Sequence, residues 1–258
     1  MHDVIVVGGG PVGSNVACKL AETGYDVLVL EQKERLGEQV CCAGIIGQEC
    51  FSSFSIDSNI VLREANSAKV FSPSGRLIRL WREENQACII DRAAFDLSMA
   101  SRAEVAGAEY GLNSPVKDIQ VKKDRVVVET IQNGNKLNPE ARVVVIATGF
   151  GAKLVEKLSL GKPGDFIVGA QAVVEARDID EVEVYLGQEV APGFFAWLVP
   201  TSPPKALVGL LSRSNPKEYL RKLLSFLKAS GKIGYNEGEI GCRGITIKPL
   251  KRTYGQQG

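Results

Sequence analysis

The chain has 258 residues, a length that suits one large domain or two modest ones. Hydrophobic residues make up 45% and charged residues 24%, which excludes a disordered protein and allows a core without structural disulfides or metal. The formal net charge of +1 provides no overall field that would attract nucleic acid or an anionic membrane.

The first part of the chain shows a strand–helix–strand pattern followed by hairpins. Apolar runs at residues 3–7 and 26–30 flank helical spacing at 11–23, which predicts two parallel strands joined by a right-handed crossover. The predicted elements that follow are an irregular segment at 32–45, a short helix near 47–54, a hairpin of 67–71 with 76–81, a helix at 92–105, a hairpin of 116–121 with 125–131, and a buried strand at 142–147.

The pattern changes beyond residue 160. Strands predicted at 166–175, 181–186, 195–199 and 206–211 indicate a second, mostly antiparallel sheet. A leucine stripe predicts a helix at 217–229, and a last strand is expected at 240–247. We therefore expect one domain at 1–160 and another at 161–258, with 67–91 a candidate part of the second and 248–258 returning toward the first.

The sequence GGGPVG at residues 8–13 carries the strongest chemical signal. It reads G-x-G-x-x-G between a predicted strand and a predicted helix. Gly8 allows a tight turn, Gly10 lets the backbone approach a diphosphate, and Gly13 lets the helix lie close to the sheet. Glu31 ends the next strand, where a carboxylate can accept hydrogen bonds from ribose hydroxyls. The pattern favours dinucleotide binding over a plain strand–helix turn.

Glu31 also limits the choice of dinucleotide. A carboxylate at this position repels a 2′-phosphate, so FAD or NAD(H) fits better than NADP(H). A NAD-dependent dehydrogenase usually continues with regular strand–helix units, whereas here an irregular loop and hairpins follow the second strand. This interruption favours FAD.

Four further segments resemble the geranylgeranyl reductase family, which lies within the flavoprotein group that includes p-hydroxybenzoate hydroxylase. VCCAG at 40–44 resembles the family's Cys-x-Gly loop near the flavin, and DRAAFD at 91–96 its Arg-x-x-Phe-Asp segment. VVIATG at 144–149 is similar to the strand that returns to the cofactor. PGFFAWLVP at 192–200 resembles the substrate-pocket motif P-x-x-Y-x-W-x-F-P, with Phe195 in place of tyrosine and Val199 in place of phenylalanine.

The resemblance implies an α/β fold: a Rossmann-like FAD-binding domain with a parallel sheet, plus a mostly antiparallel α+β substrate-binding domain. The implied FAD-binding residues are Gly8, Gly10, Pro11, Val12, Gly13, Glu31, Gln32, Gly44, Arg92, Thr148 and Gly149. The implied substrate-binding residues are Phe195, Trp197, Val199 and Pro200, and no metal site is expected.

Several of these segments also have plain structural interpretations. Cys41 and Cys42 can be small buried hydrophobic residues, a common role for free cysteine. Arg92 at a helix N-terminus is electrostatically unfavourable on its own, and a nearby phosphate would relieve the repulsion. Residues 194–199 can be an ordinary buried strand, although alternation places Phe195, Trp197 and Val199 on one face as an apolar wall suited to a prenyl chain.

The implied reaction is reduction of carbon–carbon double bonds in a prenyl lipid. Reduced FAD would give a hydride to one alkene carbon and a proton would reach the other, with Cys42 as the candidate residue nearest the reaction. The external reductant would be NAD(P)H or ferredoxin. The expected partner is the prenyl lipid, with no nucleic acid, at most peripheral membrane contact and an oligomeric state left open.

Of three alternatives, the first and third remain open. A flavin monooxygenase shares the fold but usually carries Asp-Gly where this chain has Thr148-Gly149. Electron-transfer flavoprotein–quinone oxidoreductase adds a cysteine-rich iron–sulfur module that has no counterpart here. A truncated non-catalytic dinucleotide- or lipid-binding fragment is the third, because the family pattern continues after a segment like 249–255 with a Gly-Asp-Ala-x-Gly motif, whereas this sequence stops at 258.

Cysteine usage and the N-terminus indicate a compartment. The six cysteines form no CxxC pair and no regular framework, so reduced thiols are expected. The first residues lack the pattern of a signal peptide, and the longest strongly apolar stretches are far too short to span a membrane. We expect a cytoplasmic protein, at most peripheral to a membrane.

Overall fold

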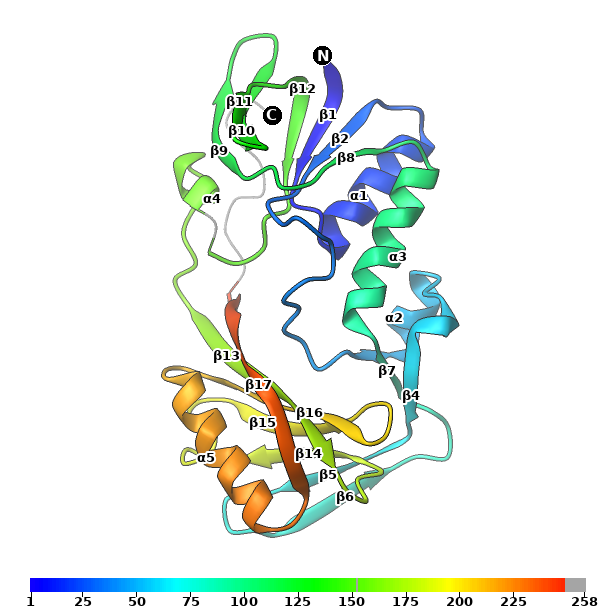
Figure 1. Cartoon of the computed structure of the whole chain (residues 1–258), viewed down its shortest axis with the longest axis vertical. Coiled ribbons are helices and arrows are strands. Elements are labelled where there is room, and N and C mark those ends of the chain that lie inside the picture. The colour runs from blue at the N-terminus through cyan, green and yellow to red at the C-terminus, as the bar shows by residue number, and fades with distance from the viewer. Residues whose placement is uncertain (152, 249–258) are drawn as a thin grey trace. The chain divides into compact units, whose positions relative to one another are not determined.

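The computed structural model describes residues 1–151 and 153–248, which form two compact units (Figure 1). The first unit contains Met1–Glu38 and Ala93–Gly164, together with Lys248. The second contains Gln39–Arg92 and Asp165–Ile247. The predicted return of 248–258 lies outside the described residues, apart from Lys248.

The first unit is built on a sheet with the order β11-β10-β12-β1-β2-β8, in which β9 also pairs with β10. The parallel part consists of β1 (His2–Val7), β2 (Val27–Leu30), β8 (Glu109–Gly111) and β12 (Glu140–Ile146). The antiparallel part consists of β9 (Val116–Val121), β10 (Val126–Gln132) and β11 (Asn135–Leu137). The helices are α1 (Pro11–Glu22), α3 (Arg92–Val105), which starts at the last residue of the second unit, and α4 (Lys153–Lys157).

The central strand β1 explains why this sheet is stable. Its side chains alternate between two apolar clusters, because Val4 and Val6 pack against the Ala17 side of α1, whereas Ile5 and Val7 face the cluster that contains Leu154 of α4. A strand buried on both faces is expected in a parallel sheet, and it accounts for the continuous apolar run in the sequence.

The second unit contains a sheet with the order β17-β13-β16-β15-β14-β5-β6 and a small sheet, β3-β7-β4. The strands of the larger sheet are β5 (Ser67–Phe71), β6 (Leu77–Trp81), β13 (Phe166–Ala176), β14 (Val182–Leu186), β15 (Phe195–Pro200), β16 (Lys205–Ser212) and β17 (Ile233–Thr246). Those of the smaller sheet are β3 (Ile45–Gly47), β4 (Val61–Ala65) and β7 (Ala87–Ile90). All pairs in the larger sheet are antiparallel except β14 with β5.

Helix α5 (Pro216–Ala229) covers one face of the larger sheet (Figure 1). Its predicted leucine stripe is confirmed as core packing, since Leu220, Leu223 and Leu227 are buried. The remaining helices are α2 (Gln48–Ser53) and a short 3₁₀ turn at Ser58–Ile60.

A buried polar cluster lies under the α5 side of the sheet. Lys232 Nζ is 2.6 Å from Glu183 Oε2 and 3.2 Å from the Tyr185 hydroxyl, which donates a hydrogen bond to the same carboxylate. Burial, followed by the hydrogen bond to Glu183, raises the pKa of Tyr185. Lys232 is the cationic partner of Glu183, so the charge of the buried carboxylate is compensated.

The predicted fold class is confirmed: an α/β unit with a parallel sheet and a unit dominated by an antiparallel sheet. The chain passes from the first unit to the second between Gly164 and Asp165, near the expected boundary at residue 160, and the second unit also contains Gln39–Arg92, which includes the candidate segment 67–91. Pairing of β5 with β14 and packing of Ile89 against Trp197 explain this. Strand β17 starts at Ile233, seven residues before the expected start at 240. Its pairing with β13 extends beyond the apolar residues on which the expectation is based.

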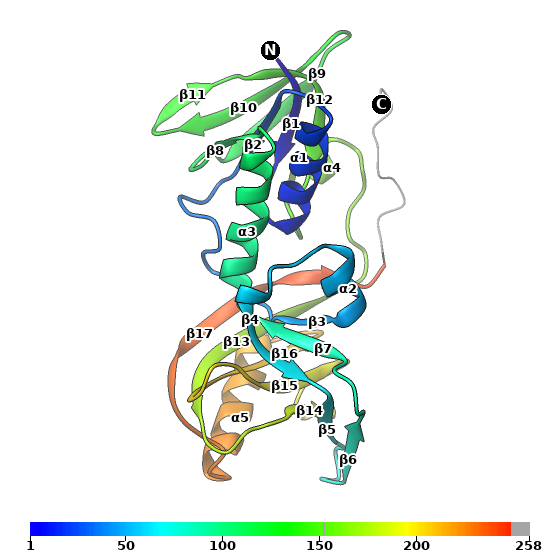
Figure 2. The same cartoon turned by 90° about the vertical axis from the view of Figure 1, so that its right-hand side faces the viewer.

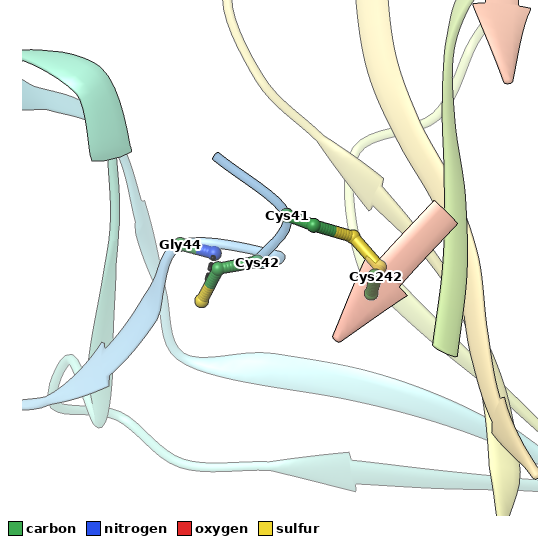
Figure 3. Close-up of a disulfide and its surroundings, with 4 residues drawn as sticks. All are labelled: Cys41, Cys42, Gly44 and Cys242. Atoms are coloured by element: carbon green, nitrogen blue, oxygen red, sulfur yellow. Dashed lines mark hydrogen bonds between the residues drawn. A yellow bond between two sulfur atoms is a disulfide. The ribbon is translucent and has the colours of Figure 1, made fainter. Parts of the chain in front are cut away.

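The expectation that all cysteines are reduced is wrong for one pair. Cys41 and Cys242 form a disulfide with a Cα–Cα distance of 5.3 Å, although 201 positions separate them in sequence (Figure 3). Spacing along the sequence could not reveal this pair, because only the fold of the second unit brings the loop and β17 together. Cys18, Cys42, Cys50 and Cys88 are free.

Within the described residues, no helix has the length and apolar character needed to cross a membrane.

Candidate functional site

The turn between β1 and α1 requires glycine at two of the predicted positions. Gly8 has φ +112°, and a Cβ there would lie 2.4 Å from the Ala147 carbonyl oxygen. A Cβ on Gly13 would lie 1.9 Å from the Gly8 carbonyl oxygen. These contacts bring the start of α1 against the ends of β1 and β12, as the motif predicts.

Gly10 differs from the other two glycines because the space beside it is open. A Cβ on Gly10 would meet no atom within 4 Å, and its φ of −74° is accessible to any residue. Gly10 is the N-cap of α1, no side chain caps this helix, and its first turn holds no acidic residue. Pro11 occupies the first turn, and Val12 is 70% exposed. The N-terminus of α1 thus offers backbone N–H groups to an anion, and these residues fit a dinucleotide diphosphate.

Glu31 lies beside this turn and is held firmly by backbone groups. Its Oε2 accepts a hydrogen bond from the Gly9 N–H at 2.7 Å, and its Oε1 accepts one from the Lys33 N–H at 3.0 Å. The side chain is buried, which fixes its position at the end of β2 next to Gln32. Each carboxylate oxygen keeps a second lone pair for a ribose hydroxyl.

Thr148 and Gly149 follow β12 and complete this edge of the sheet. Ile146 pairs with Val7, so the segment after β12 runs alongside Gly8, and a Cβ on Gly8 would lie 3.2 Å from Thr148 Cα. Gly149 has φ +70°. The predicted residues of the first unit therefore gather at the carboxyl end of the parallel strands, where ligands of such sheets bind.

The second unit brings the predicted loop residues together with Arg92. Gly44 has φ +73°, and a Cβ there would lie 2.4 Å from the Ile90 carbonyl oxygen and 3.5 Å from Arg92 Cγ. Arg92 is the first residue of α3. Cys42 is exposed, and its Sγ accepts a long hydrogen bond from the Gly44 N–H at 3.5 Å. Its side chain points away from the Cys41–Cys242 bond in Figure 3.

The predicted substrate strand presents an apolar face to the same loop. Trp197, Val199 and Phe195 belong to one apolar cluster with Ile89 of β7, and Ala43 of the loop packs against it. The rings of Phe195 and Trp197 meet edge to face at 6.1 Å. Phe194 and Phe195 stack at 4.8 Å.

Val199 and Pro200 occupy different places on β15. Val199 is fully buried in that cluster, so its side chain packs against its neighbours and is not accessible from solvent. Pro200 ends the strand, pairs with Ala206 and, by alternation, lies on the opposite face from Val199.

Two residues of this face are absent from the sequence-based prediction. Gly209 of β16 pairs with both Trp197 and Gln171, and the indole covers it, since a Cβ there would lie 2.5 Å from Trp197 Cζ2. Gln171 is 4% exposed, and within the described residues neither its Oε1 nor Trp197 Nε1 has a hydrogen-bond partner. A single glutamine within the apolar run 166–175 is the signal that could have identified it.

A family profile described as pyridine nucleotide-disulphide oxidoreductase matches residues 2–190. The chain is 30% identical over 220 residues to a digeranylgeranylglycerophospholipid reductase of Methanosarcina acetivorans, covering 81% of this chain and 54% of that protein. It is also 30% identical over 248 residues to the protein of that name from Methanocella arvoryzae, covering 90% and 63% respectively. The chain thus spans little more than half the length of the curated relatives it matches.

Solved structures show the same fold. A geranylgeranyl bacteriochlorophyll reductase-like protein from Thermoplasma acidophilum superimposes with a TM-score of 0.85 at 25% identity, over 96% of this chain and 66% of that one. A flavin-dependent brominase superimposes with a TM-score of 0.74 at 16% identity, which shows the shared fold alone. The resemblance expected from the motifs is confirmed.

Proposed function

The chain belongs to the pyridine nucleotide-disulphide oxidoreductase family, and from this premise we propose that it provides the dinucleotide-binding and substrate-binding parts of a flavin-dependent prenyl-lipid reductase. The relatives named digeranylgeranylglycerophospholipid reductase support reduction of carbon–carbon double bonds in the geranylgeranyl chains of a lipid. The observation that carries the proposal is the open N-terminus of α1 at Gly10, beside a buried and oriented Glu31.

FAD would be held in the first unit by the residues at the carboxyl edge of the sheet. The N–H groups at the start of α1 would bind its diphosphate, and Glu31 would accept hydrogen bonds from the adenosine ribose. Thr148 and Gly149 would line the same edge. Gly44 and Arg92 of the second unit complete the proposed set, with the Arg92 guanidinium suited to a phosphate oxygen. When bound and reduced, the flavin supplies the hydride.

The second unit would hold the prenyl chain. An isolated alkene has no polar group to bind, so its orientation must come from an apolar surface that excludes water. Phe195 and Trp197 supply such a surface, and the loop with Cys42 packs beside it through Ala43. In this proposal the Cys42 thiol delivers the proton to the second alkene carbon, and its exposure allows it to be protonated again from solvent.

The first test is cofactor binding by the purified full chain. We expect FAD to bind with one flavin per chain in a fluorescence titration. Substitution of the open glycine, Gly10→Val, should weaken binding at least tenfold, because the side chain would fill the space where the diphosphate approaches. A chain that binds no FAD under any condition would contradict the proposal.

The second test follows the lipid. After anaerobic reduction of the flavin by a chemical donor, by NAD(P)H or by ferredoxin, mass spectrometry of a geranylgeranyl lipid should show addition of hydrogen. Addition of oxygen would indicate a monooxygenase on the same fold. Cys42→Ala and Cys42→Ser should lower turnover at least tenfold, while Cys50→Ser, also exposed and free, should not. Undiminished turnover in both Cys42 variants would remove Cys42 from the reaction.

A further inference from the structure

Strand β6 forms one edge of the larger sheet in the second unit (Figure 2). All five of its residues are exposed. It pairs with β5 on one side, and within the described residues no strand pairs with its other side. Leu77 is 50% exposed, Ile78 62%, Leu80 57% and Trp81 56%. Four large apolar side chains on five consecutive residues of an edge strand are unusual for a surface that faces only water.

One face of β6 continues the surface that carries Trp197. Ile78 pairs with Val70, Val70 with Val184, and Val184 with Trp197, so their side chains lie in one row on one face of the sheet. Leu80 lies on the same face by alternation, next to Ala68 of the apolar cluster. Ile78 and Leu80 therefore share one face with the proposed substrate surface, whereas Leu77, Arg79 and Trp81 lie on the opposite face of the edge strand.

Arginines flank these apolar residues. Arg76 precedes the strand, Arg79 lies in its middle and Arg82 follows it. Arg79 pairs with Glu181 at 2.8 Å, whereas no ion pair is found for Arg76 or Arg82 in the part of the chain that the structure describes.

This arrangement of side chains matches a lipid–water interface. Aliphatic residues can enter the acyl boundary, tryptophan prefers the headgroup level, and arginine can extend its charge toward phosphate. Glu83 and Glu84 follow Arg82, so we expect the apolar side chains to supply most of the affinity and the arginines a preference for anionic headgroups.

We propose that β6 with its flanking arginines is a docking surface for an anionic phospholipid membrane. The proposal rests on the proposed function, because a prenyl phospholipid has to be taken from such a surface. A second copy of the chain is the less favoured occupant: fully overlapping antiparallel pairing of two β6 strands would place Arg79 directly opposite Arg79, and like charges in that position are destabilising.

The two tryptophans of the chain allow a direct test. Trp81 is exposed and Trp197 is 8% exposed, so vesicles of phosphatidylcholine and phosphatidylglycerol with brominated acyl chains should quench Trp81 selectively. We expect quenching in the unmodified chain and its loss in Trp81→Phe. In flotation with unbrominated vesicles, Leu80→Glu should bind the mixed vesicles at least tenfold less than the unmodified chain. Arg76→Gln should reduce at least threefold the preference for these anionic vesicles over vesicles of pure phosphatidylcholine.

Val105→Glu is the matched control, because Val105 is 87% exposed on the first unit, at the end of α3. It should bind vesicles as the unmodified chain does, and thermal melting should show all variants folded. Absence of vesicle binding, or an equal loss in Val105→Glu, would overturn the proposal. So would sedimentation showing a dimer that Leu80→Glu separates, without any membrane binding.

These measurements need neither flavin nor turnover, so they are independent of the proposed activity. Failure to bind vesicles with intact reduction of detergent-solubilised lipid would reject the docking surface alone. Vesicle binding without any reduction would reject the proposed function and leave the docking surface in place.

Discussion

At the residue scale, Gly10 and Gly13 of one motif have separable roles. Gly13→Ala should lower the free energy of unfolding by about 2 kcal/mol or more, because its Cβ would overlap the Gly8 carbonyl in a packed turn. Gly10→Ala should change it by less than about 1 kcal/mol, since the position is open and has an ordinary φ. Urea unfolding of both variants checks this, with the FAD titration beside it. Equal free energies of unfolding for the two variants would contradict the separate roles of Gly10 and Gly13.

Gln171 offers a second prediction at this scale. Its buried Oε1 carries a desolvation cost that no hydrogen bond within the described residues offsets. Gln171→Leu keeps most of the volume and should leave the chain equally stable or raise its free energy of unfolding by about 1 kcal/mol. Gln171→Ala, which adds a cavity, is the control and should lower it. A clear loss in Gln171→Leu would show that the amide is bonded after all.

At the element scale, an ion cluster ties the β5–β6 hairpin to the rest of its sheet. Glu181 stands just before β14, and hydrogen bonds from Ser67, then from Arg79 and Lys69, lower its pKa to about 2. Because the folded pKa lies below the ordinary value, the stabilisation is complete above about pH 4.5. It is lost as the pH falls toward 2.

Glu181→Gln should therefore cost about 1–2 kcal/mol at neutral pH, a figure reduced for solvent screening of the exposed Arg79. The difference in free energy of unfolding between this variant and the unmodified chain should decrease as the pH is lowered from 5 to the lowest pH at which the chain still folds. Chemical unfolding across that range measures it, with Glu218→Gln on the exposed face of α5 as the comparison. A difference that is constant with pH would show that the carboxylate charge is not responsible.

At the scale of the whole molecule, the Cys41–Cys242 disulfide constrains most of the unfolded chain. A closed loop of 201 positions predicts a stabilisation of about 3–5 kcal/mol from chain entropy. Without reductant, Cys242→Ser should lower the free energy of unfolding by this amount. When a dithiol is added, the variant and the unmodified chain should have the same free energy of unfolding. Thiol titration of the unfolded, unreduced chain should find four free thiols. Six would show that the disulfide does not form.

Much of the fold could be predicted from local patterns. The β1–α1–β2 unit, α3 and the β5–β6 hairpin follow from periodicity and from turn residues, and they occur where expected. The short strands β3, β4 and β7 could not be predicted, because no tight turn marks them as a hairpin and their pairing partners lie far away along the chain. The same reason explains the early start of β17 on β13.

The chemistry that resides in the turn between β1 and α1 can be inferred from neighbouring residues along the chain. The G-x-G-x-x-G residues and Glu31 belong to one β1–α1–β2 unit, so their spacing along the chain predicts that they meet at one edge of the sheet. The folded sheets bring together residues that the sequence leaves apart: Cys41 with Cys242, Gly44 with Arg92, and Gln171 with Trp197 across Gly209. These contacts depend on strand order and register, which are set by the packing of the whole sheet rather than by neighbours along the chain.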